Sequence, residues 1–360
     1  MKPAPYDVPF EAQAYQGFLA GLKNYWRTEL YRETLAEAQV HKASDVKELE
    51  ALMRHSPSAQ MYAWQERVAQ QFKFSGRWGM STVILQQRDA LEPLLAQASN
   101  VAPERLQLDP GLKVPNYVTD FDCHQLPGGL WSDPLNAWVL AWFRTGLSFA
   151  GSNPDALVDW YASELKSLAV KAAIEPGKIL DLGCTAGRST RTIKRTFPAA
   201  EVYGCDVCES VLRQGHLQSV EEGVEITLCQ QNAESLQFSD MSFDLVASHW
   251  LAHELPPDAI RNVVREAARV LRPGGVFAIY DMCTVPGGVV GEWFHAGMAL
   301  RNNEPYAYSL VAMDLHGELD AVGFTQISSR LTSPEYAGPQ PSSMPAARYM
   351  YMSMVSAIRL

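Results

Sequence analysis

The sequence predicts an α/β fold, in which helices cover both faces of a parallel sheet, preceded by an all-helical region. Two observations predict this. From residue 178 onward, short apolar segments alternate with helical stretches, which is the pattern of a parallel sheet with helical crossovers. Residues 8–100 instead show repeated helical periodicity and no alternating strand pattern. We therefore expect a helical N-terminal domain over residues 1–110, a linker over 111–155 and an α/β domain over 156–360.

Composition and charge limit the class of protein. The chain has 360 residues, of which 47% are hydrophobic and 19% charged, as in globular proteins with a large core. The net charge of -10 repels phosphate backbones, so nucleic acid is not an expected partner. Apolar runs are too short for a membrane span, and six cysteines are too few for a disulfide framework. We expect a cytoplasmic protein with reduced thiols and no membrane association.

The helical and strand elements follow in order along the chain. The aromatic residues of the N-terminal region indicate a packed helical core, and "DPLNAWVLAWFRTGLSF" and "NPDALVDWYASELKSLAV" predict two further helices. Five segments read as buried strands: "KILDLG", "EVYGCD", "EITLCQQN", "FDLVASHW" and "GVFAIYDM". Ligands of such sheets bind beyond the carboxyl ends of the strands. Polar residues that follow these strands are therefore candidate site residues.

The first strand ends in the glycine-containing turn "DLGCTAGRST". Gly183 and Gly187 permit a tight turn, and the helix that follows directs its N-terminal amides at a ligand. A dinucleotide fingerprint needs a glycine where Thr185 stands, which disfavours pyrophosphate. Asp181, just before the turn, favours a ligand that carries an ammonium and a sulfonium.

Two later strand ends supply the remaining parts of an adenosine site. Asp206 closes the second strand, where a carboxylate accepts hydrogen bonds from both ribose hydroxyls. Asn232 follows the third strand and can accept from an adenine amino group, with Ala233 and Glu234 beside the ring. Each signal is weak by itself, but their order and spacing together indicate an adenosine-containing ligand.

Over roughly residues 155–360 the chain resembles the class I S-adenosylmethionine-dependent methyltransferases. The family's motifs stand here as "ILDLGCTAGRST", Asp206, "QNAE", "FDLVASHWLAHELP" and "LRPGGVFAIYD". Two positions depart from the pattern: Thr185 replaces the usual third glycine, and Asn232 replaces the usual aspartate.

The resemblance implies a Rossmann-like sheet of seven strands that ends in an antiparallel hairpin. It also implies S-adenosylmethionine as the methyl donor and S-adenosylhomocysteine as its product. The expected donor-binding residues are Asp181, Gly183, Cys184, Gly187, Asp206, Val207, Asn232, Ala233, Glu234 and His249.

The segment "NYVTDFDCHQLPGGLWSD", residues 116–133, is a candidate active-site lid because its glycine pair lets it bend sharply. We expect Tyr117, Asp122, His124 and, at the end of the fourth strand, His249 to be catalytic. An aspartate beside a histidine can orient the imidazole and raise its basicity. The alternative is a plain linker, in which Asp122 caps a turn and His124 is structural.

The acceptor pocket is expected to draw on residues after the fourth and fifth strands and in the lid. These residues are Asp120, Trp250, His253, Tyr280, Trp293, His295 and Tyr306, with Asp281 and Glu304 also within reach. The alternative for Trp293 is a helix face packed on the core, and for His253 a turn-stabilising role. No metal site is expected, because His249 and His253 have no apparent third ligand.

These features together predict a methyltransferase that acts on oxygen or sulfur of a small molecule, with a small thiol or hydroxylated metabolite as first choice. A protein or peptide methyltransferase, or a donor-binding scaffold without activity, remains an alternative, and a dinucleotide oxidoreductase is the weakest. The helical N-terminal domain is expected to cover the site or to form a homodimer.

Overall fold

The computed structural model describes residues 4–146, 154–331 and 352–360. Its centre is an eight-stranded sheet in the order β1-β4-β3-β2-β5-β6-β8-β7. The strands are β1 (Leu106–Gln107), β2 (Lys178–Leu182), β3 (Glu201–Asp206), β4 (Thr227–Gln230), β5 (Phe243–His249), β6 (Leu271–Asp281), β7 (Phe324–Leu331) and β8 (Ser353–Arg359). Pairing is parallel except at β8, which runs antiparallel to both β6 and β7. The predicted α/β fold with a closing antiparallel hairpin is confirmed.

The sheet has eight strands where the sequence predicted seven. The additional strand, β1, lies in the region expected to be entirely helical and pairs with β4 through Leu106↔Leu228 and Gln107↔Cys229. Two residues are too few to produce an alternating pattern, so β1 leaves no signal in the sequence. It covers the edge of β4, which would otherwise expose unpaired backbone groups.

Helices cover both faces of the sheet, as expected for parallel strands. On one face, Leu180 and Leu182 of β2 pack with α12 (Pro257–Val270) and α15 (Leu315–Ala321). On the other face, Ile179 packs with α9 (Pro154–Lys171), α10 (Arg188–Thr196) and α11 (Glu209–Glu221). The alternation of β2 side chains between two buried clusters explains why the strand reads as continuously apolar.

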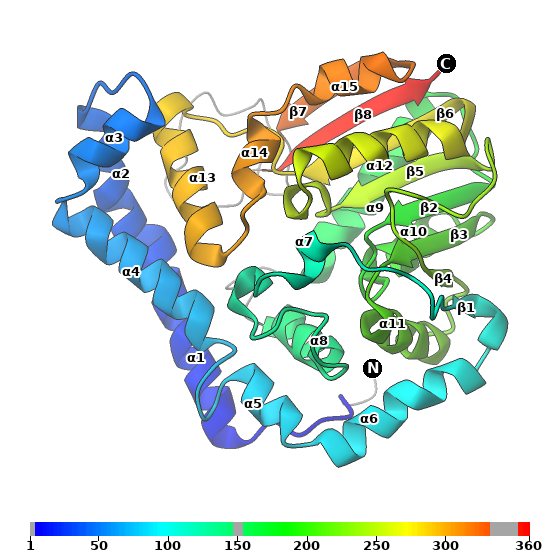
Figure 1. Cartoon of the computed structure of the whole chain (residues 1–360), viewed down its shortest axis with the longest axis horizontal. Coiled ribbons are helices and arrows are strands. Elements are labelled where there is room, and N and C mark those ends of the chain that lie inside the picture. The colour runs from blue at the N-terminus through cyan, green and yellow to red at the C-terminus, as the bar shows by residue number, and fades with distance from the viewer. Residues whose placement is uncertain (1–3, 147–153, 332–351) are drawn as a thin grey trace.

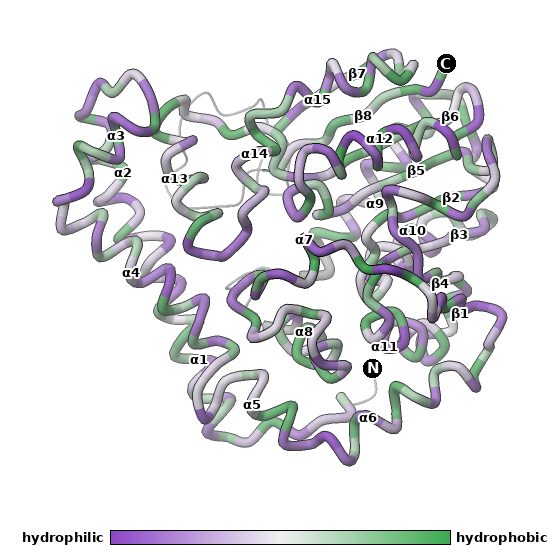
Figure 2. The backbone as a smooth tube through the Cα atoms, viewed as in Figure 1, coloured by the Kyte–Doolittle hydropathy of each residue, from purple (hydrophilic) through white to green (hydrophobic). Residues whose placement is uncertain are grey.

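The N-terminal region is helical, as predicted. Its helices are α1 (Phe10–Tyr25), α2 (Tyr31–Val40), α3 (Val46–Met53), α4 (Pro57–Phe72), α5 (Met80–Leu85) and α6 (Arg88–Gln97), with a π-helical turn, η1 (Trp26–Leu30), between α1 and α2. Figure 1 shows them along the side of the molecule opposite the sheet and turning beneath it. Hydrophobic and hydrophilic residues alternate along them in Figure 2, as in helices with one packed face.

Two groups of elements lie between these helices and the sheet. The first contains α7 (Asn116–Thr119), η4 (Cys123–Gln125) and α8 (Asn136–Gly146), and the second contains α13 (Gly288–Asn302) and α14 (Ala307–Val311). Phe294 of α13 packs with Trp26, Tyr31 and Tyr62 of the N-terminal region. The segment inserted after β6 therefore joins the two parts of the molecule.

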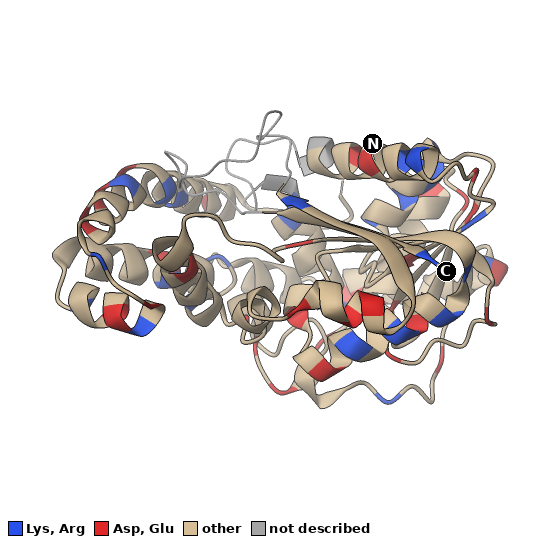
Figure 3. Ribbon diagram, turned by 90° about the horizontal axis from the view of Figure 1, so that it is seen from above, with Lys and Arg blue, Asp and Glu red and all other residues tan. Residues whose placement is uncertain are grey.

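The surface and the cysteines agree with the bulk composition. Acidic and basic residues are intermingled along the helices in the view of Figure 3. All six cysteines are free thiols. None of the helices in the described ranges is long and apolar enough to cross a membrane.

Candidate active site

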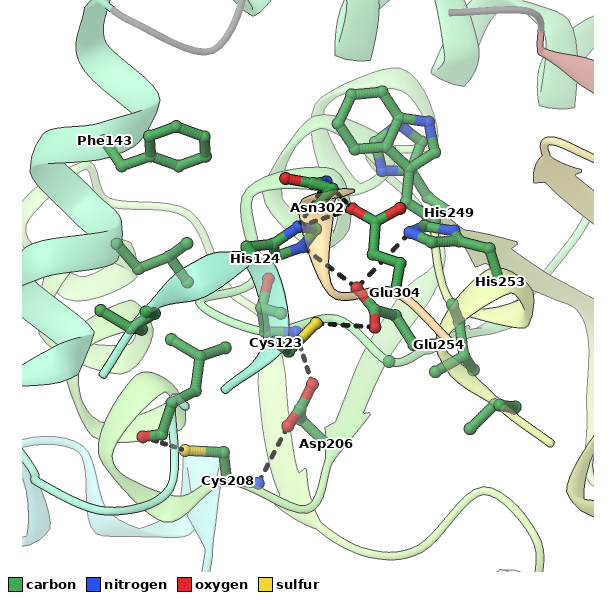
Figure 4. Close-up of a pocket in the computed structure, with 18 of the residues that line it drawn as sticks. Cys123, His124, Phe143, Asp206, Cys208, His249, His253, Glu254, Asn302 and Glu304 are labelled. Atoms are coloured by element: carbon green, nitrogen blue, oxygen red, sulfur yellow. Dashed lines mark hydrogen bonds and ion pairs between the residues drawn. The ribbon is translucent and has the colours of Figure 1, made fainter. Parts of the chain in front are cut away.

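A cavity of about 630 Å³ lies between the carboxyl ends of the strands, the 116–133 segment and the N-terminal helices. This volume is typical of small-molecule sites. Its walls include the turn after β2, the ends of β3, β4 and β5, and residues of α4 and α13. Figure 4 shows side chains from these separate elements pointing toward one another. The strand-end groups form one end of the cavity, the donor end, and the 116–133 segment with α13 forms the acceptor end.

The turn after β2 has a left-handed backbone at three positions. Gly183 and Gly187 have φ of 63° and 62°, and Thr185 between them has φ of 47°. A Cβ at Gly183 would lie 2.7 Å from Leu251 Cδ1, so this position also needs glycine for space. Two hydrogen bonds fix Thr185. Its N–H donates to Asp206 Oδ2 (2.9 Å), and Arg144 Nη2 donates to its Oγ1 (2.8 Å). These bonds hold a threonine in a conformation that is unusual for a β-branched residue.

Asp206 is positioned to bind a ligand at the end of β3. Its Oδ1 accepts from the Cys208 N–H (2.9 Å) and its Oδ2 from the Thr185 N–H. Burial raises the pKa of this carboxyl above its ordinary value. A carboxylate has about four acceptor positions, so Asp206, which lines the cavity, retains capacity for two hydroxyl donors.

Asp181 has a different place from the one expected. It is fully buried and is not among the residues that line the cavity. Its Oδ2 accepts from Ser189 Oγ (2.7 Å) and Thr190 Oγ1 (2.6 Å), which fixes the first turn of α10. Burial raises its pKa to about 6. Asp181 therefore acts on a ligand only through the helix that it holds.

The other expected donor-binding residues divide into two groups. Those that line the cavity are Gly183, Cys184, Asp206, Val207, Asn232, Ala233 and His249. Gly187 and Glu234 are not among the residues that line the cavity. A Cβ at Gly187 would lie 3.1 Å from Leu228 Cδ2 of β4. Glu234 Oε1 accepts from the Tyr117 hydroxyl (2.5 Å), which ties the 116–133 segment to the strand ends.

An aromatic wall bounds the middle of the cavity. The His249 ring is stacked with Trp250 (centroids 5.1 Å apart, 8° between planes) and Tyr280 (5.5 Å, 12°). Burial, together with Arg144, lowers the pKa of His249 to about 3. Among the described residues, no group hydrogen-bonds to its buried Nε2. His249 is thus a neutral imidazole at physiological pH, with an open hydrogen-bonding position.

At the acceptor end, His124 is held between two glutamates (Figure 4). Its Nδ1 lies 2.7 Å from Glu304 Oε1 and its Nε2 lies 3.1 Å from Glu254 Oε1. Cys123 Sγ donates to Glu254 Oε2 (2.9 Å). Burial lowers the pKa of His124, but its neighbours Cys123, Glu304 and Glu254 outweigh burial and hold that pKa well above its ordinary value.

The sequence predicted that His124 pairs with Asp122, but in the structure His124 contacts these two glutamates instead. Asp122 is exposed, and its Oδ1 accepts from the Gly128 N–H (2.8 Å), which closes a turn. His124 and Gln125 both have a left-handed backbone, with φ of 57° and 63°. Positions 122 and 124 of this turn do not present their side chains to each other, so proximity in the sequence misled the prediction.

His253 supports Glu254 from the other side. Its Nδ1 lies 2.7 Å from Asp281 Oδ1, and its Nε2 lies 3.5 Å from Glu254 Oε1. Burial lowers the pKa of His253, but Asp281 and Glu254 outweigh it and hold that pKa well above the ordinary value.

Several residues expected in the acceptor pocket are not among those that line the cavity. Trp293 packs against the N-terminal helices, and its Nε1 donates to Glu50 Oε2 (2.6 Å). The buried His295 contacts the Ala307 carbonyl (3.0 Å) at the start of α14. The ring of Tyr306 packs edge-on against Tyr117 and Phe121, and Asp120 is exposed. Tyr117, His124, Trp250, His253 and Tyr280 do line the cavity.

Among the cavity residues that were not selected from the sequence are Lys73, Cys123, Arg144 and Glu254. Cys123 adjoins a predicted histidine and Glu254 follows another, so both had a signal by proximity. Lys73 lies in the turn after α4 and Arg144 lies in α8, and the periodicity of these helices gives no indication of the cavity that the two residues line. Lys73 is buried and Arg144 is half-buried, which only the fold reveals.

Known protein families resemble the C-terminal part of the chain. A family model described as a methyltransferase domain matches residues 179–275. An uncharacterised methyltransferase from Synechocystis sp. is 32% identical over 167 residues, which cover 46% of this chain and 74% of the relative. A sterol 24-C-methyltransferase from Yarrowia lipolytica is 35% identical over 117 residues, 32% of this chain. The match spans only 30% of that sterol enzyme.

Solved structures also resemble the chain. The magnesium protoporphyrin IX methyltransferase from Synechocystis PCC 6803, with bound SAH, superposes with a TM-score of 0.45 at 15% identity. That superposition covers 64% of this chain and 96% of the other.

Proposed function

The chain belongs to the class I S-adenosylmethionine-dependent methyltransferases, and we propose that it methylates oxygen or sulfur of a small thiol or hydroxylated metabolite. When bound, S-adenosylmethionine supplies an electrophilic methyl group on a sulfonium. One observation carries the proposal: a single cavity joins the strand-end groups Asp206 and Asn232 to the buried acceptor cluster around His124.

The residues at the donor end suit this cofactor. Asp206 would accept from the ribose hydroxyls and Asn232 from the adenine amino group. Burial and the neighbouring Arg188 and Arg191 lower the pKa of Arg144 to about 10. A half-buried guanidinium among other cations stabilises an anion, so Arg144 fits the carboxylate of the methionine portion.

The acceptor end suits a hydrogen-bond donor such as a hydroxyl or thiol. Glu304 is 3% exposed, and within the described ranges its Oε2 has no hydrogen-bond partner. A buried unpaired carboxylate oxygen is costly, and an acceptor O–H or S–H would satisfy it. We assign proton acceptance to Glu304, His124 and Glu254 as a unit, because each holds the next in place.

Lys73 indicates that the acceptor also carries an anionic group. Its side chain is 5% exposed, with Nζ 4.5 Å from the centroid of the Phe143 ring. Burial and the neighbouring Lys23 hold the pKa of Lys73 well below its ordinary value. Its Nζ donates to Gln70 Oε1 (2.5 Å), but no carboxylate of the described chain forms an ion pair with it, so a carboxylate or similar group on the acceptor would neutralise its charge.

Methylation at carbon is a second candidate, because the relatives include a sterol 24-C-methyltransferase and a ubiquinone/menaquinone C-methyltransferase. The same cluster would then deprotonate a ring hydroxyl and thereby activate a neighbouring carbon. The position of the methyl group in the product separates the two reactions.

Two further assignments concern the surroundings of the site. We propose that the 116–133 segment is a lid, supported by its bonds to Glu234, Glu254 and α13 across the cavity. We also propose that the N-terminal helices form a homodimer, since Phe18 and Trp64 are 66% and 61% exposed. Sedimentation velocity of the wild type and of Trp64→Glu tests this: a wild type that stays monomeric contradicts it.

The proposed function is tested by incubating the purified chain with isotope-labelled S-adenosylmethionine and fractionated cell extract, followed by mass spectrometry. We expect label on oxygen or sulfur of a small anionic molecule, and a raised KM for that molecule in Lys73→Met. Label on carbon would favour the second candidate. Label on polypeptide, or donor binding without any product, would overturn the proposal.

A further inference from the structure

We propose that Cys123, His124 and Glu254 bind one divalent metal ion of the zinc class at the acceptor end of the cavity. One ligand atom from each residue, namely Sγ, a ring nitrogen and a carboxylate oxygen, lies within 4.8 Å of the other two. Bonds of about 2.0–2.3 Å around a tetrahedral zinc ion separate its ligand atoms by roughly 3–4 Å. The spacing therefore allows all three groups to reach one ion after small side-chain adjustments.

The types of donor select the metal. A thiolate and an imidazole favour borderline-soft ions such as Zn²⁺ over Mg²⁺ and Ca²⁺, which prefer oxygen ligands only. Three protein ligands also leave one tetrahedral position open, as in catalytic rather than structural zinc sites. All three residues line the cavity, so the open position would face the acceptor.

Each of two ligands is oriented by a second residue, as in known metal sites. Glu304 contacts His124 Nδ1 (2.7 Å), which fixes the tautomer that presents Nε2 as a ligand. His253 approaches Glu254 Oε1 with its Nε2 and is itself held by Asp281 through Nδ1. An ion pair on a protein surface has no such supporting carboxylates and histidines.

No metal was expected from the sequence, because the pair His249 and His253 has no apparent third ligand. In the structure His249 is stacked between aromatic rings, and His253 lies behind Glu254. The ligand set instead joins the lid to η5 (Ala252–Glu254), across 131 positions of sequence. No sequence spacing could have indicated that set.

The same contacts would also exist in a metal-free network, in which a cationic imidazole bridges two carboxylates. Metal binding differs in one measurable way, because Cys123 must become a thiolate ligand and the ligands release their protons. The role of the open position rests on the proposed function: this position would take the oxygen or sulfur of the acceptor.

Cobalt and zinc titrations of the full chain, prepared without a polyhistidine tag and stripped with a chelator, test the proposal. We expect one Co²⁺ per chain, with a near-ultraviolet thiolate-to-cobalt charge-transfer band that Cys123→Ser abolishes. Competition with a chromophoric chelator should show Zn²⁺ affinity reduced about 100-fold or more in His124→Asn and Glu254→Gln, and about 10–100-fold in Glu304→Gln. Asparagine tolerates the left-handed backbone at position 124.

Cys283→Ser and the exposed His55→Asn are matched controls that should bind metal like the wild type. Circular dichroism and calorimetric donor binding establish that each variant is folded. A wild type without the charge-transfer band, or with Zn²⁺ affinity equal to that of the ligand variants, overturns the proposal. The titration uses neither donor nor acceptor, so the metal site can fail while methyl transfer is observed, and the reverse.

Discussion

At the donor end of the cavity, the polar groups stand at the ends of neighbouring strands, whereas at the acceptor end they come from segments remote in sequence. Asp206 ends β3 and Asn232 follows β4, and these two strands pair in register. Cys123 and Glu254, by contrast, are 131 positions apart. The donor end is thus part of the sheet, while the acceptor end forms only when the 116–133 segment and α13 pack over it. The two ends should therefore fail separately when mutated.

The largest expected effect is at the donor end. Asp206→Ala removes the carboxylate that anchors the turn and would bind the ribose, so the Kd for S-adenosylmethionine should rise about 1000-fold, given 1.5–3 kcal/mol for each charged hydrogen bond. Isothermal titration calorimetry measures this, with the exposed Asp240→Ala as the control. Near-normal donor affinity in Asp206→Ala would show that the donor lies elsewhere.

The next effect is at the acceptor end. His124→Asn should lower kcat about 100–1000-fold, because it removes Nε2 and disconnects Glu254 from Glu304. Initial rates with labelled donor and the identified acceptor measure it, beside His55→Asn. Unchanged kcat would return the 116–133 segment to the role of a plain linker.

The third prediction concerns Asp181, which is buried beside the donor end and fixes the first turn of α10. Asp181 has a folded-state pKa of about 6 against an ordinary value of 3.8, so the native state binds more protons between these values. Stability contributed by the protonated carboxyl is present below about pH 4 and is lost as the pH rises through 6, by about 3 kcal/mol. When urea unfolding is measured across this pH range, the free energy of unfolding of the wild type should fall by about 3 kcal/mol relative to that of Asp181→Asn. Parallel curves would contradict the account of Asp181.

The smallest effect separates the structure from the sequence prediction. Asp122→Asn should change kcat by less than about threefold, since Asp122 closes a turn and does not touch the imidazole. Glu304→Gln should lower kcat at least tenfold, since Glu304 does contact it. Equal losses of kcat in the two variants would support the Asp122–His124 pair that the sequence predicted.

The sequence located residues that line one end of the cavity, because strand ends and tight turns are local features. The positions of Gly183, Asp206 and Asn232 follow from short patterns, and parallel pairing brings them to one edge. The sequence showed that Thr185 departs from the family pattern but not what compensates for it. Arg144, which donates a hydrogen bond to Thr185, lies in a separate helix.

The acceptor end was predicted only in part, for a physical reason. His124 does line the cavity, but its partners depend on how the 116–133 segment packs on α13, which no local pattern encodes. The same holds for Trp293, whose apolar helix packs on N-terminal helices that the sequence could not place beside it. β1 was missed because its two residues make a strand only by pairing with β4.

The most direct test of the separation between the two ends is calorimetric titration of S-adenosylmethionine into His124→Asn. If the ends are independent, this variant binds the donor with a Kd within about threefold of the wild type, even though its turnover is largely lost. A loss of donor affinity as large as that of Asp206→Ala would contradict the account, because His124 would then belong to the donor site.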